Sequence, residues 1–467
     1  MNNLNIDLNK INRIHMIGIG GVSMSGIAVM LKKAGFNVAG SDSAEGDMVK
    51  ILRDENIDVF IGHNKDLVKD ADLVVYTAAI KETDEELVEA HRLGITTIER
   101  APFLGILLKE YQKPICIAGM HGKTTTTSMI ASAFMKLNTN PTVLVGSKLK
   151  ELGDVNYLIG NNEYFVLEAC EYVDSFLNFP PETAIILNIE EEHLDYFKDL
   201  NQIKESFIKF ISMLPKNGKL IINKDDVNCM DVLNSVSSFI KENNITVLTY
   251  SINDKTANLY ADNIGTNNKG CYQYDLYING EFVTNISLSS PGKHNVLNSL
   301  ATAGSIYSNN LSVSQAKESI EEFTGASRRF EYKKTIGNNV NVYDDYAHHP
   351  TEIEATLESA RNKSKNKVIA VFQPHTYSRT KTLFNSFSKC FDKADIVILT
   401  DIYAAREIDD GTISSKMLVD ELIKNGINAM YISTFEDIAN KLNEIIEEDD
   451  IVLTIGAGTI TKLSDLL

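Results

Sequence analysis

The 467-residue chain contains no tryptophan, only nine prolines and only five cysteines. The cysteines stand far apart, at Cys116, Cys170, Cys229, Cys271 and Cys390, and no two of them form a C-x-x-C pair. This spacing argues against a disulfide framework and against a cysteine-based zinc cluster. We therefore expect most of the five to be buried thiols.

Long apolar runs and an excess of basic charge are also missing. No segment reaches the roughly eighteen consecutive apolar residues of a membrane span, and the first residues lack the apolar core of a signal peptide. The net charge of -18 disfavours a nucleic-acid surface, which requires basic patches. We expect a cytoplasmic protein with small-molecule partners and without a membrane or nucleic-acid partner. Whether it is a monomer or a homodimer stays open.

The stretch 114–127, PICIAGMHGKTTTT, predicts a buried strand, a glycine turn and a helix. Gly119 and Gly122 allow a tight turn whose backbone N–H groups converge on a phosphate at the helix N-terminus. Lys123 is then placed to reach terminal phosphates, and Thr124 to offer its hydroxyl to Mg²⁺. Ile117 stands where the full G-x-x-x-x-G-K-[ST] motif has a glycine, so an ordinary glycine turn is the alternative.

A second glycine turn, GIGGVSMSG, follows the predicted strand at 13–18. Gly18 and Gly20 match the dinucleotide fingerprint G-x-G-x-x-G, whereas Ser23 occupies the place of the third glycine. Asp42 ends the next predicted strand at the distance where such folds contact a ribose. We predict a nucleotide-binding domain here. A nicotinamide-dependent dehydrogenase is an alternative that Ser23 disfavours.

Polar residues follow two later predicted strands of the central part. YFVLEAC delivers Glu168, and TAIILNIEEEHLDYF delivers three glutamates and His193. Because ligands gather at the carboxyl ends of strands in open α/β sheets, these groups are expected to face the same crevice as Lys123. A carboxylate and an imidazole there suit a divalent metal ion. Taken alone, Glu168 could be a solvent-exposed carboxylate and His193 a helix cap.

The central part is predicted to end in an antiparallel edge. The run 272–288 alternates in polarity around an Asn-Gly pair, which is typical of a hairpin with a type I′ turn. SPGKHNVLNSLAT then opens a helix, and His294, Asn295 and Asn298 offer the donors and acceptors that an adenine edge requires.

The last part begins with TGASRRFEY at 324–332, where Gly325 and the paired Arg328 and Arg329 predict a hinge with anion-binding capacity. Strands alternate with helices beyond it, and polar loops follow the strands: DDYAHHP, FQPHTYSRT, DIYAARE and GAGTITK. Two of these loops carry histidines. Together with Arg379 they predict a convergent polar site.

These patterns predict an α/β protein of three domains, as the length of the chain also suggests. We expect a Rossmann-like N-terminal domain at 1–112 and a Rossmann-like C-terminal domain at 324–467. Between them, residues 113–323 are expected to form a central phosphate-loop domain with an antiparallel edge.

The motifs resemble, in this order and over essentially the whole chain, those of the Mur ligases. The matching stretches are IHMIGIGGVSMSGIA, GSD, GMHGKTTTT, LEAC, LNIEEEHLDYF, PGKHNVLN, TGASRRFE, DDYAHHPTEI, FQPHTYSRT and GAGTI. The shorter phosphate loop of that family, G-x-x-G-K-[ST], accounts for Ile117. Three positions depart from the usual pattern: Met120 replaces threonine, and Cys170 and Glu192 replace aspartates.

The resemblance is strongest to family members that use L-alanine. It implies an ATP- and Mg²⁺-dependent ligase of peptidoglycan precursor synthesis, which joins L-alanine to the lactyl carboxylate of UDP-N-acetylmuramate through an acyl phosphate. The first domain would bind the UDP-sugar, the central domain ATP, and the third the amino acid. Alternatives are a recycling ligase that adds a peptide and, more distantly, a nucleotide-dependent switch protein without catalytic activity.

The resemblance also implies roles for individual residues. Catalytic roles fall to Lys123, Glu168, His193, His348 and His375. The metal ligands would be Thr124, Glu168 and His193. ATP binding falls to Gly119, Met120, His121, Gly122, Lys123, Thr124, Thr125, His294, Asn295, Asn298, Arg328 and Asp345. UDP-sugar binding falls to Gly18, Gly20, Gly21, Ser23, Met24, Ser25, Asp42 and Arg100. Amino-acid binding falls to His349, His375 and Arg379. A histidine of the last loops would deprotonate the incoming amine, and which one stays open.

Overall fold

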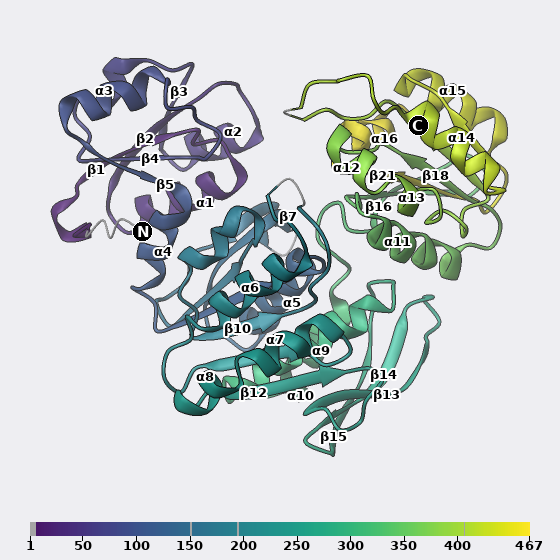
Figure 1. The fold of residues 1–467 in the computed structure, drawn as a ribbon, viewed down its shortest axis with the longest axis horizontal. Helices are drawn as coiled ribbons and strands as arrows, with labels where there is room; N and C mark the ends of the chain where they lie inside the picture. The colour runs from purple at the N-terminus through teal and green to yellow at the C-terminus, as the bar shows by residue number, and fades with distance from the viewer. Residues whose placement is uncertain (1–5, 150–151, 194–195, 406) are drawn as a thin grey trace. The chain divides into compact units, whose positions relative to one another are not determined.

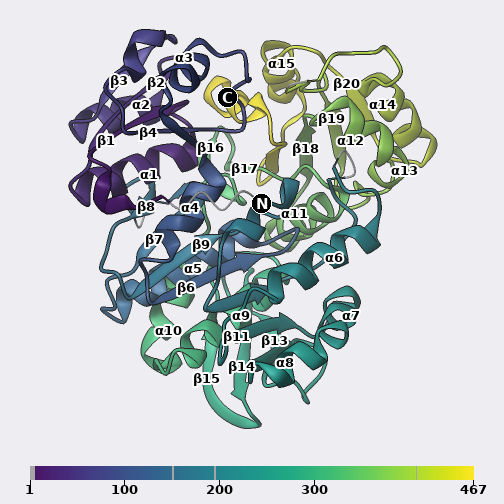
Figure 2. The ribbon, with the colours of Figure 1, turned by 60° about the vertical axis from the view of Figure 1, so that its left-hand side comes forward.

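The structure, a computed structural model, describes residues 6–149, 152–193, 196–405 and 407–467. Its strands form three sheets with helices between them, so the predicted three-domain α/β organisation is confirmed (Figures 1 and 2). Residue contacts divide the chain into two compact units. Unit 1 comprises residues 1–249 and 301–312, and unit 2 comprises residues 250–300 and 313–467.

The first sheet of unit 1 is parallel, in the order β3-β2-β1-β4-β5. Its strands are β1 Arg13–Ile17, β2 Asn37–Asp42, β3 Asp58–Ile61, β4 Leu73–Tyr76 and β5 Thr96–Glu99, of which the first two lie where the sequence analysis placed strands. The helices are α1 Val22–Lys33, α2 Asp47–Asp54, α3 Glu85–Leu93 and α4 Arg100–Leu108, with short 3₁₀ turns at Leu8–Lys10 and Lys65–Val68. The strand order reverses between β1 and β4, which is where Rossmann-like sheets bind ligands. The first glycine turn lies at that point.

The second sheet has seven strands that lie wholly or partly in unit 1, in the order β12-β11-β10-β6-β9-β7-β8. They are β6 Lys113–Ala118, β7 Thr142–Leu149, β8 Val155–Leu158, β9 Tyr164–Glu168, β10 Thr183–Ile186, β11 Lys219–Asn223 and β12 Thr246–Ser251. The run 115–118 is completely buried, which explains why β6 lies between two parallel neighbours, β9 and β10. The antiparallel pair β7–β8 was not predicted.

The helices of this second sheet are α5 Lys123–Lys136, α6 Leu200–Ile211, α7 Val227–Ser235 and α8 Ser237–Glu242, with a 3₁₀ segment at Tyr172–Asn178. Val236 leaves the helical region, with φ -97° and ψ 11°, and so separates α7 from α8.

One hydrophobic core runs through both sheets of unit 1, from Ile14 to Ile245. Helix α1 packs on β7 and β8 at Gly26, where an added Cβ would come within 2.6 Å of Leu144. The side-chain amide of Asn156 on β8 also donates to the carbonyl of Val22 at 2.9 Å. The glycine is required for this close packing, which fixes the first glycine turn relative to the central sheet.

Unit 2 begins with an antiparallel patch of β13 Leu259–Thr266, β14 Tyr272–Ile278 and β15 Glu281–Ser287. Asn279 and Gly280 join β14 to β15 with φ values of 50° and 84°, as the predicted type I′ turn requires. Strand β13 was not predicted. Helix α9 His294–Ser308 passes from unit 2 into unit 1, and α10 Val313–Glu322 follows.

The sheet of the C-terminal part has the order β16-β17-β21-β18-β19-β20. Its strands are β16 Glu331–Ile336, β17 Val340–Asp345, β18 Val368–Phe372, β19 Ile396–Leu399, β20 Ala429–Tyr431 and β21 Ile451–Ile455. Its helices are α11 Pro350–Lys363, α12 Tyr377–Thr382, α13 Phe384–Phe387, α14 Ser415–Lys424, α15 Phe435–Ile445 and α16 Leu463–Leu466, with a 3₁₀ turn at Thr459–Lys462. Buried apolar clusters cover both faces. Strand β16, antiparallel to β17, was not predicted and begins inside the expected hinge at 324–332.

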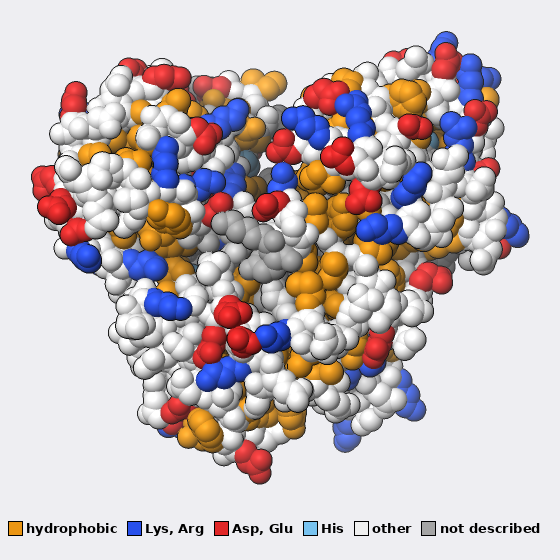
Figure 3. Space-filling model, turned by 180° about the vertical axis from the view of Figure 1, so that it is seen from behind, with side chains coloured by type: hydrophobic (Ala, Val, Ile, Leu, Met, Phe, Trp, Pro, Cys, Tyr) orange, Lys and Arg blue, Asp and Glu red, His pale blue; other side chains and the backbone are white. Residues whose placement is uncertain are grey.

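The surface drawn in Figure 3 carries charges of both signs. On the face drawn in Figure 3, Lys and Arg side chains are scattered among Asp and Glu side chains rather than gathered together. Within the described ranges, no helix has both the length and the apolar character needed to cross a bilayer. All five cysteines are free thiols and only Cys170 is exposed, which confirms the expectation that most are buried.

Candidate active site

The loop between β6 and α5 has the form of a phosphate-binding loop. Gly119 and Gly122 adopt φ values of 140° and 83°, which favour glycine. A Cβ at Gly119 would also lie 3.0 Å from Leu187. Asn188, just beyond β10, accepts from the backbone N–H of His121 at 2.8 Å and donates to its carbonyl at 2.9 Å. The loop is therefore held open in a fixed shape by the next strand of the sheet.

Lys123 is bound by its surroundings within unit 1. Its ammonium group donates to the carbonyl oxygens of Gly119 and Met120 and lies 2.9 Å from a carboxylate oxygen of Glu171. Glu171 is completely buried, and its other oxygen lies 3.3 Å from Nε2 of His193. The three side chains form a chain of charge-assisted contacts beside the phosphate loop.

The charges of this group support one another. Burial by itself raises the pKa of Glu171, but Lys123 and His193 more than offset it and hold the pKa below its usual value. Burial likewise lowers the pKa of Lys123, and the Glu171 carboxylate reverses that shift and raises it. Both groups are thus ionised at neutral pH. Glu171 was not among the predicted site residues, and the only sequence signal was its position three residues after Glu168.

Thr124 and Glu168 meet at the base of the loop. The threonine hydroxyl donates to Oε1 of Glu168 at 2.9 Å, and the backbone N–H of Gly146 on β7 donates to Oε2 at 2.6 Å. Two neighbouring oxygen donors of this kind suit Mg²⁺. His193, the third predicted ligand, lies against Glu171 and the ring of Tyr172, whose centroid is 4.7 Å from its own. The structure therefore brings two of the three predicted ligands into direct contact.

A pocket of about 100 Å³ joins the two sheets of unit 1. Ser23 on α1 and Arg100 at the start of α4 line it from the first sheet, and Gly146, Glu168 and Cys170 line it from the second. Two residues predicted for the UDP-sugar thus share a cavity with the predicted metal ligand Glu168. Arg100 supplies a permanent positive charge.

The other residues predicted for the UDP-sugar surround the first glycine turn. Gly18 has a φ of 76°, and the N–H of Gly20 donates to the carboxylate of Asp42 at 2.8 Å. Gly21 caps α1. Met24 and Ser25 are buried, so their side chains face the core rather than a ligand. This turn can therefore present backbone N–H groups at a helix N-terminus to a phosphate.

Of the residues predicted for the phosphate loop itself, Met120 and Thr125 are buried and His121 is partly exposed.

The polar residues predicted for adenine lie in unit 2, at the start of α9. The amide of Asn298 donates to the side-chain oxygen of Asn295 at 2.9 Å, and the amide of Asn295 donates to the carbonyl of Pro291. His294 is the first residue of the helix.

Arg328 and Asp345 lock the segment before β16 onto the C-terminal sheet. The guanidinium donates to the carboxylate of Asp344 at 2.9 Å and to the carbonyls of Gly456 and Gly458. Asp345 accepts from the N–H groups of Phe330 and Ala347, both at 2.7 Å. Burial raises the pKa of Asp345 to about 6. If this segment contains a hinge, its movable part lies before Arg328.

The two predicted histidine loops meet in unit 2. The rings of His348, which follows β17, and His375, which follows β18, lie 6.0 Å apart. Arg379 on α12 contacts Nδ1 of His375 at 3.1 Å, and Tyr403 stacks on the same ring. His349 is buried at the N-cap of α11. The convergent polar site expected in the last third of the chain is therefore present.

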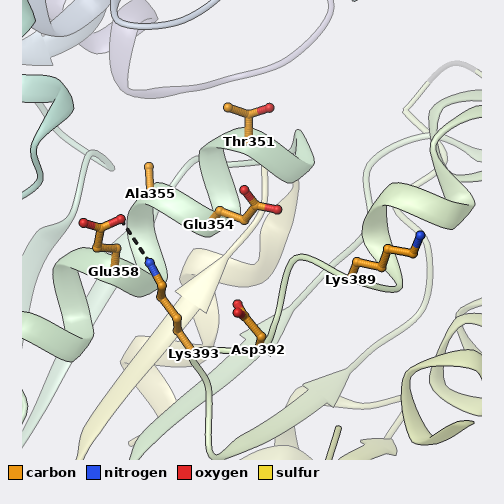
Figure 4. Close-up of a pocket in the computed structure, with 7 residues that line it drawn as sticks. All are labelled: Thr351, Glu354, Ala355, Glu358, Lys389, Asp392 and Lys393. Atoms are coloured by element: carbon orange, nitrogen blue, oxygen red, sulfur yellow. Dashed lines mark hydrogen bonds and ion pairs between the residues drawn. The ribbon is translucent and has the colours of Figure 1, made fainter. Parts of the chain in front are cut away.

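Unit 2 also has a surface hollow of about 370 Å³ beside α11. Figure 4 shows its lining, in which Glu358 and Lys393 form an ion pair at 3.0 Å. The remaining charged residues there are Glu354, Lys389 and Asp392. None of the predicted site residues lines this hollow, and its charges of both signs define no particular ligand.

Comparison with known families gives matches along most of the chain. The "Mur ligase family, catalytic domain" matches residues 13–112, the "Mur ligase middle domain" residues 117–306, and the "Mur ligase, glutamate ligase domain" residues 328–458. Two curated proteins named "UDP-N-acetylmuramate--L-alanine ligase", from Caldanaerobacter subterraneus and Clostridium botulinum strain Kyoto, are each 47% identical to this chain. The alignments cover 99% and 98% of this chain and 98% of each relative.

Solved structures of Mur ligases match the fold of this chain. A UDP-N-acetylmuramate-alanine ligase from Thermotoga maritima matches with a TM-score of 0.80 and 28% identity over 97% of both chains. A murein peptide ligase from Psychrobacter arcticus matches with a TM-score of 0.72 and 24% identity, again over 97% of both chains. At this identity, the second match supports a shared fold only.

Proposed function

This chain belongs to the Mur ligase family, and on that premise we propose that it joins L-alanine to UDP-N-acetylmuramate with conversion of ATP to ADP and phosphate. The observation that carries the proposal is 47% identity, over nearly the full length, to relatives named for this reaction. The product would be UDP-N-acetylmuramoyl-L-alanine, a peptidoglycan precursor.

The chemistry explains why ATP is needed. Formation of an amide from a carboxylate is uphill in water, so the carboxylate first requires a good leaving group. A lactyl carboxylate oxygen attacks the γ-phosphorus of ATP, the bond to the β-γ bridging oxygen breaks, and ADP leaves with the bonding electrons. The resulting acyl phosphate is then attacked by the amine, and phosphate departs.

The first step is served by the charged group at the phosphate loop. The Lys123 ammonium neutralises charge that develops on the phosphoryl oxygens, as preorganised cations do in phosphoryl transfer. In the present arrangement Lys123 is paired with Glu171, so ATP would replace part of that pairing. When bound by Thr124 and Glu168, Mg²⁺ would supply further positive charge to the phosphates. His193 would complete this site from its position beside Glu171.

The substrates would be placed by different elements. The pocket shared by Ser23, Arg100 and Glu168 supports a route for the sugar nucleotide from the first glycine turn toward the phosphate loop. Arg379, with the histidine loops of unit 2, would hold L-alanine through its carboxylate, because a guanidinium is well matched to that group.

Phosphate release tests the proposal directly. Purified protein with ATP, Mg²⁺ and UDP-N-acetylmuramate should release phosphate on addition of L-alanine, and glycine and serine are assayed in parallel. A parallel arm uses the peptide L-alanyl-γ-D-glutamyl-meso-diaminopimelate, because murein peptide ligases share this fold. Turnover with the peptide and not with L-alanine would assign the chain to recycling, and turnover with neither would refute a ligase of this substrate.

A further inference from the structure

The ring of His375 is held in one protonation state by its neighbours. Arg379 Nη1 lies 3.1 Å from its Nδ1, and a guanidinium can only donate, so Nδ1 accepts and the ring proton is on Nε2. Burial, with help from His348 and Arg379, lowers the pKa of His375 to about 4. At neutral pH this side chain is an uncharged ring whose Nε2–H can donate a hydrogen bond.

The backbone directly after His375 is strained. Thr376 adopts φ 67° and ψ 144°, a region that β-branched residues rarely enter. Its N–H donates to the carbonyl of Tyr403 at 2.9 Å, and the Tyr403 ring stacks on His375 with centroids 5.6 Å apart. Strain of this kind persists where the surroundings over-determine a conformation, as is common at functional sites.

His348 is held in the opposite tautomer. Its Nδ1 lies 3.0 Å from the carbonyl oxygen of Tyr346 and 3.4 Å from a carboxylate oxygen of Glu352. Both partners can only accept from it, so Nδ1 carries the proton and the lone pair is on Nε2. The carboxylate of Glu352 is fixed by the backbone N–H groups of His348 and His349 at 3.0 and 3.3 Å. This is the arrangement of a base whose orientation is set by a carboxylate.

We propose that His348 is the base that takes a proton from the amine of L-alanine, and that His375 donates a hydrogen bond to the bound amino acid and does not act as a base. This assignment rests on the proposed ligase function. The amine nitrogen forms a C–N bond with the acyl carbon, the bond from that carbon to the phosphate oxygen breaks, and phosphate leaves with the bonding electrons. The proton lost by the nitrogen moves to Nε2 of His348 and then to solvent.

The charges around the two rings favour this division. Glu352 faces His348 and stabilises the imidazolium that forms when the proton arrives. Arg379 faces His375 and opposes a positive charge on it, which Glu407 only partly offsets. Arg328 and Arg329 lie over the ring of Tyr346, at 5.0 and 5.4 Å. If both histidines were charged they would repel each other, so a neutral His375 leaves His348 able to gain the proton.

The test compares two variants with two acceptors. His348→Gln and His375→Gln are each assayed with L-alanine and with hydroxylamine, a nucleophile that is uncharged at neutral pH and needs no base to trap an acyl phosphate. Thermal unfolding confirms that each variant is folded. His348→Asn is the second variant at that position, because its amide can still donate to the Tyr346 carbonyl while lacking Nε2.

We expect His348→Gln and His348→Asn to slow ligation of L-alanine by about 10²–10⁴-fold, the usual contribution of a general base, with hydroxamate formation nearly unchanged. The acid limb of kcat should also disappear. His375→Gln should raise KM for L-alanine and retain that limb. Retention of the rate and the acid limb in both His348 variants, or loss of the limb in His375→Gln, would overturn the assignment. Absence of hydroxamate with the wild type would instead refute the proposed function.

Discussion

The phosphate-loop site of unit 1 and the histidine cluster of unit 2 both follow the carboxyl ends of parallel strands, yet they differ in charge. The Lys123 ammonium group and the buried Glu171 carboxylate are both ionised and paired, and His193 lies 3.3 Å from that carboxylate. Around His375 the ring is kept neutral by burial and by Arg379. The first arrangement suits neutralisation of phosphate charge, whereas in the second a neutral His375 leaves the neighbouring His348 able to take up a proton. The two steps of the reaction should therefore respond to different substitutions.

Lys123→Ala should have the largest effect, because it removes the only cation that the described part of the phosphate loop itself supplies. Ligation and hydroxamate formation should both fall by about 10³-fold or more, as for lost charge stabilisation in phosphoryl transfer. Binding of UDP-N-acetylmuramate, measured by calorimetry, should change little. Near wild-type turnover in this variant would contradict the proposed role of the loop.

Glu168→Gln should come next, with a rate loss of about 10²-fold and a raised Mg²⁺ requirement, because a neutral amide is a weaker ligand for a hard cation. The measurement is the rate as a function of Mg²⁺ concentration. Its control is Glu163→Gln, which alters a partly exposed ion pair with Lys113 of the same sheet. An unchanged Mg²⁺ dependence would assign Glu168 to structure through Gly146 and Thr124.

Glu171→Gln should act mainly on stability. It leaves the Lys123 ammonium buried without its carboxylate, which typically costs about 3–5 kcal/mol. Denaturant unfolding measures the loss, and the double variant Lys123→Met/Glu171→Gln should recover most of it without recovering activity. Equal stability of the single variant and the wild type would show that the ion pair contributes nothing.

The two buried carboxylates should have opposite pH dependences. The pKa of Glu171 is lowered on folding, so its contribution to stability is present above its unfolded pKa and is lost as pH falls through the folded value. The pKa of Asp345 is raised to about 6, so its contribution is present below about 4 and is lost as pH rises to 6.

The variant Asp345→Asn should abolish the pH dependence of stability that Asp345 causes, which amounts to roughly 2 kcal/mol between pH 4 and 7. Unfolding free energies of the variant and the wild type, measured across this range, check the sign. A wild-type stability that rises from pH 4 to 6 more steeply than that of Asp345→Asn would contradict it.

The smallest effect should come from Gly280→Ala in the β14–β15 turn. Its φ of 84° is strained for alanine although no atom lies within 4 Å of the added Cβ, so we expect a loss of about 1 kcal/mol. Both acceptor reactions should keep their wild-type rates. This variant calibrates how much activity changes when stability alone is altered.

The sequence predicted best those parts of the fold that are buried and local. Parallel strands such as β1 and β6 are short and almost wholly buried, and their positions were predicted closely. β16, by contrast, consists only of partly exposed and exposed residues, and β13 becomes polar toward its end. Both strands are defined by their pairing, β16 with β17 and β13 with β12 and β14, which the weak polarity pattern of each strand does not indicate.

In the candidate site, too, some features could be predicted from the sequence and others could not. The contact between Thr124 and Glu168 follows from the rule that polar groups gather at strand ends. The burial of Glu171 does not, because it comes with an unusual backbone in which Val173 and Asp174 have φ values of 50° and 56°. Nothing in the letters EYVD indicates that turn. Both histidine loops were found, but the sequence does not show which ring nitrogen of each histidine contacts Tyr346, Glu352 or Arg379.

The division of unit 1 into two chain segments has a consequence for biosynthesis. The ribosome completes residue 249 of unit 1 and then makes about fifty residues of unit 2 before it reaches 301–312, the second half of α9 and its cap. Ala301 and Ile306 are fully buried there. At roughly 5–20 residues per second, the nascent first segment waits several seconds for its last helix. During that interval it exposes an apolar surface, and chaperones would have the opportunity to bind it.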